Sequence, residues 1–336
     1  MSEEYDSKIV AEHWSMADCS ASDRNFYCFP AIRNRSCRLI FGETDASRKD
    51  WCEYWTIEKY LKPLVPVGRC LSICCGFGEV ERTLARLGAA ERITGIDIAP
   101  GAIEQARVRA DREGFHNIEY RVCDVNKEEL PEAEYDLIWA NGALHHIRDI
   151  ELVVGRLSRA LKPGGLLVSN EYVGPDYQQL SVRQQEIINA VKHLLPRELR
   201  TPLTGPPDAP GPSLGAKVKD LLGRVVNSYK LRDDVVYEKL WDMPSVAWFR
   251  KTDPSECVRS SAIVPVLKEH FAEVDVRYFN GSIIFYALDQ AFYQNYDPGS
   301  AAHRRLLEMI FALEEHYVAC GEFQQDNAHI ICRKVQ

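Results

Sequence analysis

The stretch 69–80, Arg-Cys-Leu-Ser-Ile-Cys-Cys-Gly-Phe-Gly-Glu-Val, constrains the fold of this chain more than any other. Its apolar first half has the length of a buried strand, and Val80 and Leu84 then begin a helical spacing. Between the two patterns lie Gly76 and Gly78, and a residue without a Cβ atom allows a tight turn and close approach of a ligand. The stretch predicts a strand, a glycine turn and a helix whose first N–H groups face that turn.

The same alternation of strand and helix continues along the chain. Strands are expected at 70–75, 92–98, 118–124, 135–140 and 166–170, with helices at 79–88, 101–113 and 150–161 between them. Further helices are expected at 51–61, 184–195, 263–270, 281–295 and 300–320, and two last strands at 271–278 and 327–334. Such alternation indicates an α/β fold with a parallel sheet and helices on both faces. Ligands of these sheets bind beyond the carboxyl ends of the strands.

Two classes of ligand fit the glycine turn. A dinucleotide-binding turn needs a third glycine, but Glu81 stands in that place and is a poor residue for close helix–strand packing. The other class of ligand has no diphosphate. Asp97 ends the second predicted strand, where a carboxylate can accept hydrogen bonds from both hydroxyls of an adenosine ribose in either class, or can cap the next helix.

Five segments, in order from Cys70 to Ser169, resemble the class I S-adenosylmethionine-dependent methyltransferases. They are the glycine turn, Asp97, Asp124, the run Trp139–Ile147 containing Leu-His-His-Ile, and the Lys-Pro-Gly-Gly-Leu-Leu turn at 162–167. Two positions depart from the pattern, since Ser72 replaces the usual acid and Cys74 the usual first glycine. The segments 170–175 and 195–199 resemble a bacterial subgroup associated with glycan and secondary-metabolite genes.

This resemblance implies S-adenosylmethionine as cofactor and a seven-stranded Rossmann-like sheet. Asp97 would bind the ribose, Asp124 would contact the adenine amino group beside Val125, and Asn141 would lie beside the methionine part of the cofactor. The complete set of expected cofactor residues is Ser72, Cys74, Gly76, Gly78, Asp97, Ile98, Asp124, Val125 and Asn141.

A methyltransferase acting on a hydroxyl needs a base, and three residues that follow predicted strand ends are candidates: His145, His146 and Glu171. Each has another reading, since a histidine here can pack or cap the next helix and Glu171 can bind a substrate hydroxyl or a metal. The aromatic residues Tyr172, Tyr237, Trp241, Trp248 and Phe249 are expected either to line an acceptor pocket or to fill a core. No metal is expected, because the spacing of Asp149, Glu171 and Asp176 gives no support for one.

The composition of the chain argues against some classes of binding partner. The net charge of −8 argues against a nucleic acid, and no apolar run approaches the roughly 18 residues of a membrane helix. The polar, acidic N-terminus is unlike a signal peptide, and the 11 cysteines are scattered, so we expect a cytoplasmic protein with reduced thiols. The expected partner is a small-molecule acceptor, and a homodimer is left open.

We expect four parts: an N-terminal helical lid at 1–62, a cofactor-binding core at 63–172, a substrate-binding insertion at 173–265, and a C-terminal completion of the sheet at 266–336. One or two short helices of the first part should lie over the cofactor. The expected reaction is methyl transfer to oxygen or nitrogen of a small molecule such as a sugar or natural product. The alternatives are an NAD(P)-dependent oxidoreductase and a non-catalytic S-adenosylmethionine-binding protein of the same fold.

Overall fold

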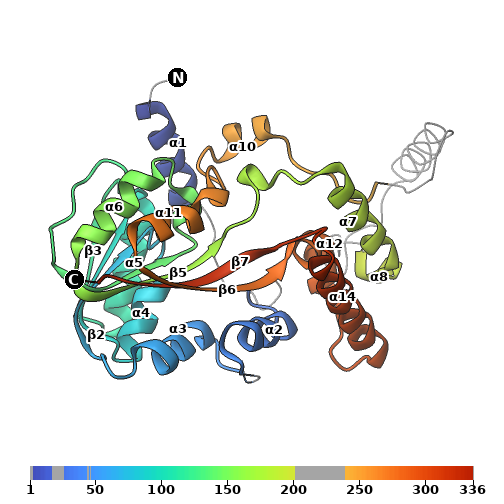
Figure 1. Ribbon diagram of the computed structural model, residues 1–336, viewed down its shortest axis with the longest axis horizontal. Helices are drawn as coiled ribbons and strands as arrows, with labels where there is room; N and C mark the ends of the chain where they lie inside the picture. Colours follow the sequence, from blue (N-terminus) through green and yellow to red (C-terminus); the bar gives the residue numbers. More distant parts are fainter. Residues whose placement is uncertain (1–2, 17–25, 44, 46, 201–238, 336) are drawn as a thin grey trace.

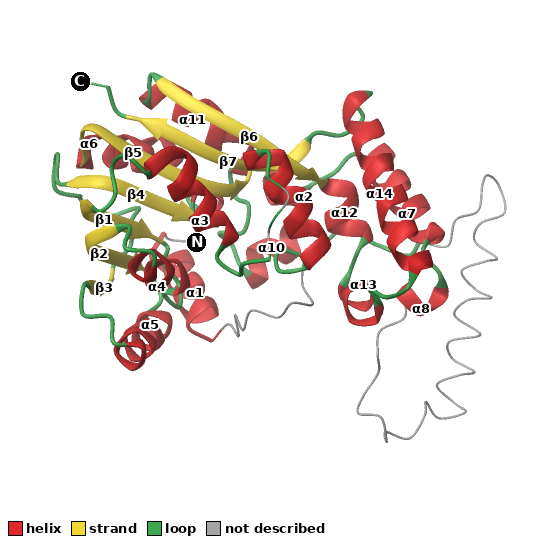
Figure 2. Cartoon of the chain, turned by 90° about the horizontal axis from the view of Figure 1, so that it is seen from below, coloured by secondary structure: helices red, strands yellow, loops and turns green. Residues whose placement is uncertain are grey.

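A seven-stranded sheet forms the centre of the molecule (Figures 1 and 2). The computed structural model describes residues 3–16, 26–43, 45, 47–200 and 239–335. The strands are β1 (Val67–Ile73), β2 (Ala90–Asp97), β3 (Ile118–Val122), β4 (Tyr135–Asn141), β5 (Leu161–Tyr172), β6 (Glu273–Gly281) and β7 (Gln325–Arg333), in the order β3-β2-β1-β4-β5-β7-β6. The pairs among β1 to β5 are parallel, and β7 runs antiparallel to both β5 and β6. This arrangement confirms the predicted Rossmann-like α/β fold.

Helices cover both faces of the sheet. Those packed directly on it or on its edge are α2 (Pro30–Phe41), α3 (Trp51–Thr56), α4 (Glu79–Arg86), α5 (Pro100–Glu113), α6 (Ile150–Ala160) and α11 (Ile263–His270). Alternate residues of each strand face opposite layers. On β4, for example, Ile138 packs toward the layer of α6 and α11, while Trp139 packs toward the layer of α4.

A second hydrophobic core lies beyond the far end of β6 and β7 (Figure 1). It is built from α7 (Val182–Leu194), α8 (Arg197–Arg200), α12 (Ser282–Ala287), α13 (Gln290–Asn295) and α14 (Ala301–Ala319), together with Phe26, Phe29 and Ile32 near the N-terminus. The remaining elements are the N-terminal helix α1 (Glu3–Met16), the π-helix η1 (Ile57–Leu61), the short 3-10 helices η2 (Leu144–His146), η3 (Asp176–Gln178) and η4 (Ser260–Ala262), and α10 (Val246–Thr252). Segments far apart in sequence therefore share this core. The expected division of the chain into four parts stays a prediction.

A buried ion pair joins the second core to the sheet. Arg35 of α2 donates through Nη1 to Glu314 of α14 and to Asn280 at the end of β6, both at 2.8 Å. Glu314 also accepts from the backbone N–H groups of Gly281 and Ile284. Both charges are almost fully buried, so each depends on the other for compensation.

Some element boundaries differ from those predicted. The region 281–295, expected as one helix, is two, because the Asp289 side chain caps α13 by accepting from the Ala291 and Phe292 N–H groups. β5 starts at Leu161 rather than at 166, since Leu161 already pairs with Tyr135 of β4 and a register shift at the Lys-Pro-Gly-Gly turn precedes the pairing of Leu166. Tyr237 lies outside the described residues.

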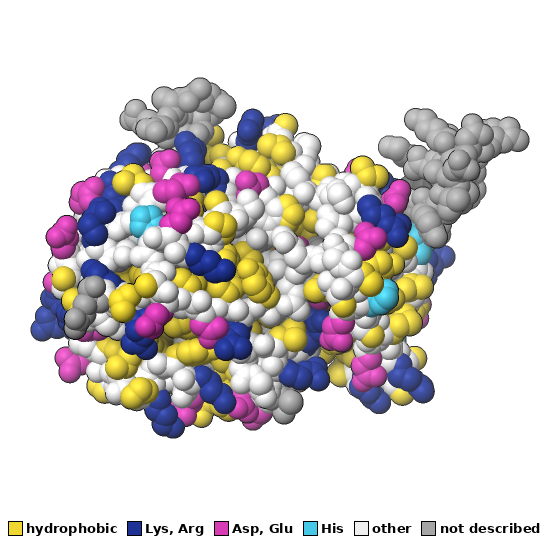
Figure 3. Space-filling view, viewed as in Figure 1, with side chains coloured by type: hydrophobic (Ala, Val, Ile, Leu, Met, Phe, Trp, Pro, Cys, Tyr) yellow, Lys and Arg dark blue, Asp and Glu magenta, His cyan; other side chains and the backbone are white. Residues whose placement is uncertain are grey.

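None of the described helices combines the length and apolar character that a membrane crossing requires. On the face shown in Figure 3, Lys and Arg side chains alternate with Asp and Glu side chains instead of forming one basic field. Nucleic-acid binding depends on such a field, so this face offers no support for it.

Candidate active site

A crevice of about 790 Å³ opens at the carboxyl ends of β1, β2 and β4. This volume lies within the range typical of small-ligand sites, about 300 to 1,000 Å³. Its walls include Ser72, Cys74, Gly76, Asp97, Ile98, Asp124, Val125, Asn141 and His146, together with Ser7, Val10 and Trp14 from α1. Of the nine cofactor residues expected from the sequence, eight line this one crevice. Of the N-terminal helices, α1 closes one side of the crevice and α2 packs against β6, and the expected cover over the cofactor stays a prediction.

Asp97 anchors the glycine turn to the end of β2. Its Oδ2 accepts from the Gly76 N–H at 2.9 Å, and its Oδ1 accepts from the Ala99 N–H at 2.8 Å. The carboxylate is largely buried, and this burial raises its pKa, although the two amide bonds act in the opposite direction. Each carboxylate oxygen can accept a second hydrogen bond, so Asp97 retains capacity for a ligand.

The turn itself needs left-handed backbone. Gly76 has φ +51°, and nothing lies within 4 Å of the place where its Cβ would be, so the turn is open to a ligand there. Cys74 has φ +49°, a region that favours glycine, which explains why a glycine is usual at this position in the resembling family.

Gly78 packs closely against Tyr120. A Cβ on it would lie 2.3 Å from the Tyr120 hydroxyl oxygen, and that hydroxyl donates to the Gly78 carbonyl at 3.2 Å. Gly78 is therefore required for the packing of the turn on β3. It is absent from the described lining of the crevice, so a cofactor contact for Gly78 stays a prediction.

Glu81, the residue that disfavours a dinucleotide, is fully buried between α4 and the sheet. Burial raises the pKa of its carboxyl to about 7, and the neighbouring Ser72 hydroxyl acts in the opposite direction. Ser72 and Glu81 both contribute to the wall of the crevice. The position that is usually acidic on β1 is thus a serine with a carboxyl group beside it from α4.

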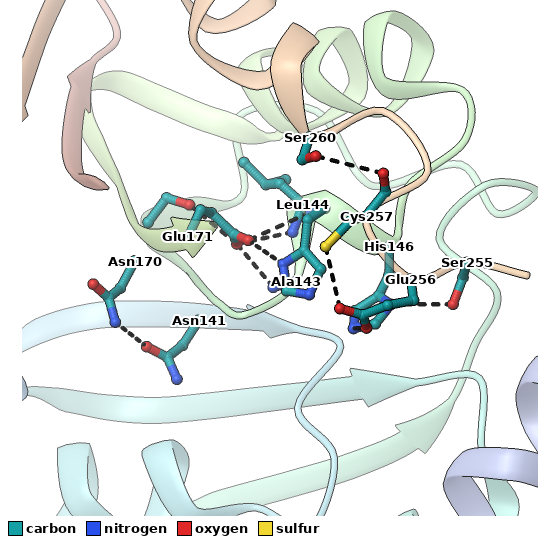
Figure 4. Close-up of polar contacts among 12 residues, drawn as sticks. Asn141, Ala143, Leu144, His146, Asn170, Glu171, Ser255, Glu256, Cys257 and Ser260 are labelled. Carbon is teal, nitrogen blue, oxygen red and sulfur yellow. Dashed lines mark hydrogen bonds and ion pairs between the residues drawn. The ribbon is translucent and has the colours of Figure 1, made fainter. Parts of the chain in front are cut away.

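Asp124 and Asn141 already have partners within the protein. Asp124 Oδ2 accepts from the Ser7 hydroxyl at 3.3 Å and lies 3.1 Å from the Lys127 ammonium nitrogen. The Asn141 side-chain oxygen accepts from Asn170 at 3.3 Å (Figure 4). Both residues line the crevice, and the specific ligand contacts expected of them stay predictions.

The three candidate bases meet at one place. Glu171 is buried on β5, and its Oε1 accepts from the N–H groups of Ala143 and Leu144, both at 2.8 Å (Figure 4). Its Oε2 lies 2.7 Å from Nδ1 of His145. Burial alone would lower the pKa of His145, but the hydrogen bond and charge of Glu171 raise it overall. Burial and the adjacent His145 lower the pKa of His146 to about 4.

Sequence reasoning missed the segment 253–257, which packs against these histidines. Ser255 Oγ lies 3.1 Å from His146 Nδ1, and Glu256 Oε2 lies 3.8 Å from His146 Nε2. Trp14 of α1 donates to Asp253 at 3.2 Å and packs edge-on against His146, with ring centroids 5.2 Å apart. The only signal in the sequence is the polar run Asp-Pro-Ser-Glu-Cys, and more than a hundred residues separate it from the histidines.

Tyr27 also belongs to this region. Removal from bulk water raises its pKa, and the neighbouring Glu256, Cys257 and Glu171 raise it further. Yet 52% of its surface is exposed.

The expected acceptor residues do not form one group. Tyr172 is buried, and its hydroxyl lies 3.4 Å from the Pro175 carbonyl oxygen. Trp241 packs against Tyr286 with ring centroids 5.1 Å apart, and Phe249 is buried. Trp248 is 51% exposed and lies outside the crevice lining, so its expected role in acceptor binding receives no support.

Comparison with known proteins finds relatives for the part of the chain that contains the glycine turn and the strands around it. Residues 70–165 match the family model described as a methyltransferase domain. Residues 70–165 of this chain therefore resemble a methyltransferase domain. S-adenosylmethionine is the cofactor of the class I methyltransferases, and the crevice lies where that cofactor is expected.

Individual relatives share the methyltransferase domain rather than the whole chain. The ubiquinone biosynthesis O-methyltransferase of Bradyrhizobium sp. (strain ORS 278) is 35% identical over 100 residues, 30% of this chain and 38% of that protein. The malonyl-[acyl-carrier protein] O-methyltransferase of Acetivibrio thermocellus is 34% identical over 175 residues, 52% of this chain and 53% of that protein. The chain thus spans about half or less of the length of these curated relatives.

Among solved structures, phosphoethanolamine N-methyltransferase 2 of Haemonchus contortus in complex with S-adenosyl-L-methionine aligns with a TM-score of 0.43 and 18% identity. The alignment covers 95% of this chain and 61% of that one.

Proposed function

We propose that this protein transfers a methyl group from S-adenosylmethionine to an oxygen or nitrogen of a small molecule. The observation that carries the proposal is the Asp97 carboxylate, which ends β2, holds the Gly76 amide and faces a crevice of suitable volume. The open position at Gly76 fits the cofactor, because its backbone has no side chain to obstruct it. When bound, the cofactor supplies a methyl group activated by a positively charged sulfur.

The residues of this chain would hold the cofactor at three strand ends. Asp97 would accept from the ribose hydroxyls, Asp124 and Val125 would face the adenine, and Asn141 would lie along the methionine part. α1 would exclude water, since Ser7, Val10 and Trp14 close one side of the crevice. A drier site favours a reaction in which the charge on sulfur disappears.

Of the three candidate bases, His145 is the one held by the Glu171 carboxylate, and its ring lies beside His146, which lines the crevice. Glu171 is an acceptor only, so the Nδ1 of His145 carries the proton in their hydrogen bond, and Nε2 retains its lone pair. Glu171 is itself fixed by two backbone N–H groups, which makes it a positioning residue for His145. A base held in this way contributes roughly 10² to 10⁴ in rate when the acceptor is a hydroxyl.

The acceptor class follows less directly. Carboxylates and the Ser255 hydroxyl surround the histidines, which suits a polar small molecule with hydroxyl or amino groups. The relatives include a ubiquinone biosynthesis O-methyltransferase and a malonyl-[acyl-carrier protein] O-methyltransferase. The association with glycan or natural-product biosynthesis stays part of this proposal.

Neither alternative function is favoured. For the oxidoreductase, the buried Glu81 occupies the position where a dinucleotide turn requires glycine for close packing. For the non-catalytic protein, the Glu171–His145 pair would be an arrangement without a use. Thermal shifts with S-adenosylmethionine against NAD separate the first alternative, and release of S-adenosylhomocysteine with a panel of acceptors separates the second.

Calorimetry on Asp97→Ala tests the proposal directly. We expect its affinity for S-adenosylhomocysteine to fall by more than tenfold, because a charge-assisted hydrogen bond contributes about 1.5 to 3 kcal/mol. Asp111→Ala, on the exposed side of α5, is the matched control and should bind as the unmodified protein does. Equal affinities for the two variants would remove Asp97 from the site, and the absence of binding by the unmodified protein would contradict the proposed function.

A further inference from the structure

Four side chains with metal-binding atoms meet beside the crevice. His145 and His146 come from η2, and Glu256 and Cys257 come from the loop between α10 and η4. Cys257 Sγ lies 3.1 Å from Glu256 Oε1, and His146 Nε2 lies 3.8 Å from Glu256 Oε2 (Figure 4). The ligand atoms of His145, Glu256 and Cys257 all lie within 4.8 Å of one another. Two segments distant in sequence thus bring nitrogen, oxygen and sulfur donors together.

Hydrogen bonds on the outer side fix the tautomer of each histidine. The Ser255 hydroxyl has one hydrogen, and at 2.6 Å it donates this to Asp253 Oδ1. Toward His146 Nδ1, at 3.1 Å, Ser255 can therefore only accept, so Nδ1 carries the proton and Nε2 a lone pair. The carboxylate of Glu171 imposes the same tautomer on His145.

In this arrangement a hydrogen-bond acceptor of His146 faces the Glu256 carboxylate, which is also an acceptor. The lone pair on His146 Nε2 is directed toward the side of Glu256, which as a carboxylate only accepts. Carboxylate or hydroxyl partners behind both histidines match the outer shell found around metal-bound imidazoles, where they orient the ring and increase its basicity. A cation bound by Glu256 would compensate this contact between two acceptors.

The geometry points to a divalent cation site, of the zinc type, with His145, the Glu256 carboxylate and Cys257 Sγ as ligands and the fourth position open. Zinc bonds of about 2.0 to 2.3 Å in a tetrahedron separate neighbouring ligand atoms by roughly 3.3 to 3.8 Å; Glu256 Oε1 and Cys257 Sγ lie 3.1 Å apart, and the other separations are within 4.8 Å. A set of an imidazole, a carboxylate and a thiolate favours Zn²⁺ over Mg²⁺, which prefers oxygen donors. Binding would release the Cys257 thiol proton to solvent. This assignment departs from the metal-free site expected from sequence spacing.

The position of the site gives the cation a role, and this part rests on the proposed function. His146 and Ser255 also line the cofactor crevice, so the cation would lie on the acceptor side of the methyl group. A Lewis acid there would bind an acceptor oxygen and favour its deprotonated form, in place of a histidine base.

Metal analysis of the purified full-length chain tests the site. After dialysis against metal-free buffer, Zn²⁺ is titrated against a chromogenic chelator, and bound metal is counted by elemental analysis. We expect one Zn²⁺ per chain, with affinity lowered at least tenfold in Glu256→Gln and Cys257→Ser. Cys320→Ser is the matched control, because Cys320 and His316 form an exposed pair with Sγ and Nε2 3.7 Å apart. Its affinity should equal that of the unmodified protein.

Co²⁺ substitution adds a spectroscopic readout. The Co²⁺ form should show thiolate-to-metal absorption that Cys257→Ser loses and Cys320→Ser keeps. Binding of S-adenosylhomocysteine by each variant shows that it is folded, and it also tests the proposed function separately. No Zn²⁺ on the unmodified chain, equal affinity in all variants, or a loss confined to Cys320→Ser would each overturn the site, whatever the result with S-adenosylhomocysteine.

Discussion

The cofactor crevice and the second hydrophobic core are built in opposite ways. The crevice draws its wall from the ends of consecutive strands and from the turns that follow them, so neighbours in space are close in strand order. The second core combines residues near the N-terminus with helices from both sides of β6. The part of the molecule around the crevice is thus locally encoded, whereas the second core depends on contacts between distant segments.

The crevice and the second core also differ in what compensates their buried charged groups. In the crevice, buried carboxylates such as Asp97 are held by backbone N–H groups of the adjoining turn. At the second core, Glu314 needs Arg35, which lies 279 residues away. Loss of a residue should therefore have local consequences in the crevice and global consequences at the second core.

The largest expected effect is the loss of the buried ion pair. Glu314→Ala leaves the Arg35 guanidinium buried without its main partner and should lower the free energy of unfolding by about 3 to 5 kcal/mol. Glu315→Ala is the control, because its exposed carboxylate lies 3.4 Å from Arg35 Nη2 and should contribute less than about 1 kcal/mol. Urea denaturation measures both. Similar losses in the two variants would mean that burial of the pair does not decide stability at this junction.

A smaller effect is expected in the crevice wall, from Glu81. Its folded-state pKa of about 7 exceeds the ordinary value of 4.5, so the folded protein holds this proton where the unfolded chain has lost it. Stability should therefore fall as pH rises from 5 to 8, by about 2 to 3 kcal/mol more in the unmodified protein than in Glu81→Gln.

Urea denaturation at several pH values gives the difference between the two proteins, and other titrating groups cancel in it. Parallel pH profiles would show that Glu81 ionises in the folded protein as it does in the unfolded chain. Because Glu81 belongs to the crevice wall, residues of the second core should not affect the difference between these two pH profiles.

The same contrast explains what sequence could predict. The sheet, the order of its elements along the chain and the eight expected residues that line the crevice follow from patterns within single strand–turn units, where spacing determines position. The contact of Gly78 with the Tyr120 ring leaves no sign in the sequence, because it joins two separate strand–turn units. Glu256 and Cys257 could not be foreseen at all, since only the packing of the loop on η2 brings them to the histidines.

The smallest effect should come from one helix cap in the second core. Ser181 and Gln184 form a capping box at the start of α7, with the Ser181 hydroxyl accepting from the Gln184 N–H at 3.2 Å. Ser181→Ala should lower the free energy of unfolding by about 1 kcal/mol, while Ser181→Asp, which keeps the acceptor, should retain most of it. Because α7 packs on α12, a cooperative molecule would show this loss in one transition, with unchanged dependence on urea. A second transition in Ser181→Ala would instead show that the second core unfolds separately from the sheet. The two regions would then differ in how they unfold as well as in how the sequence encodes them.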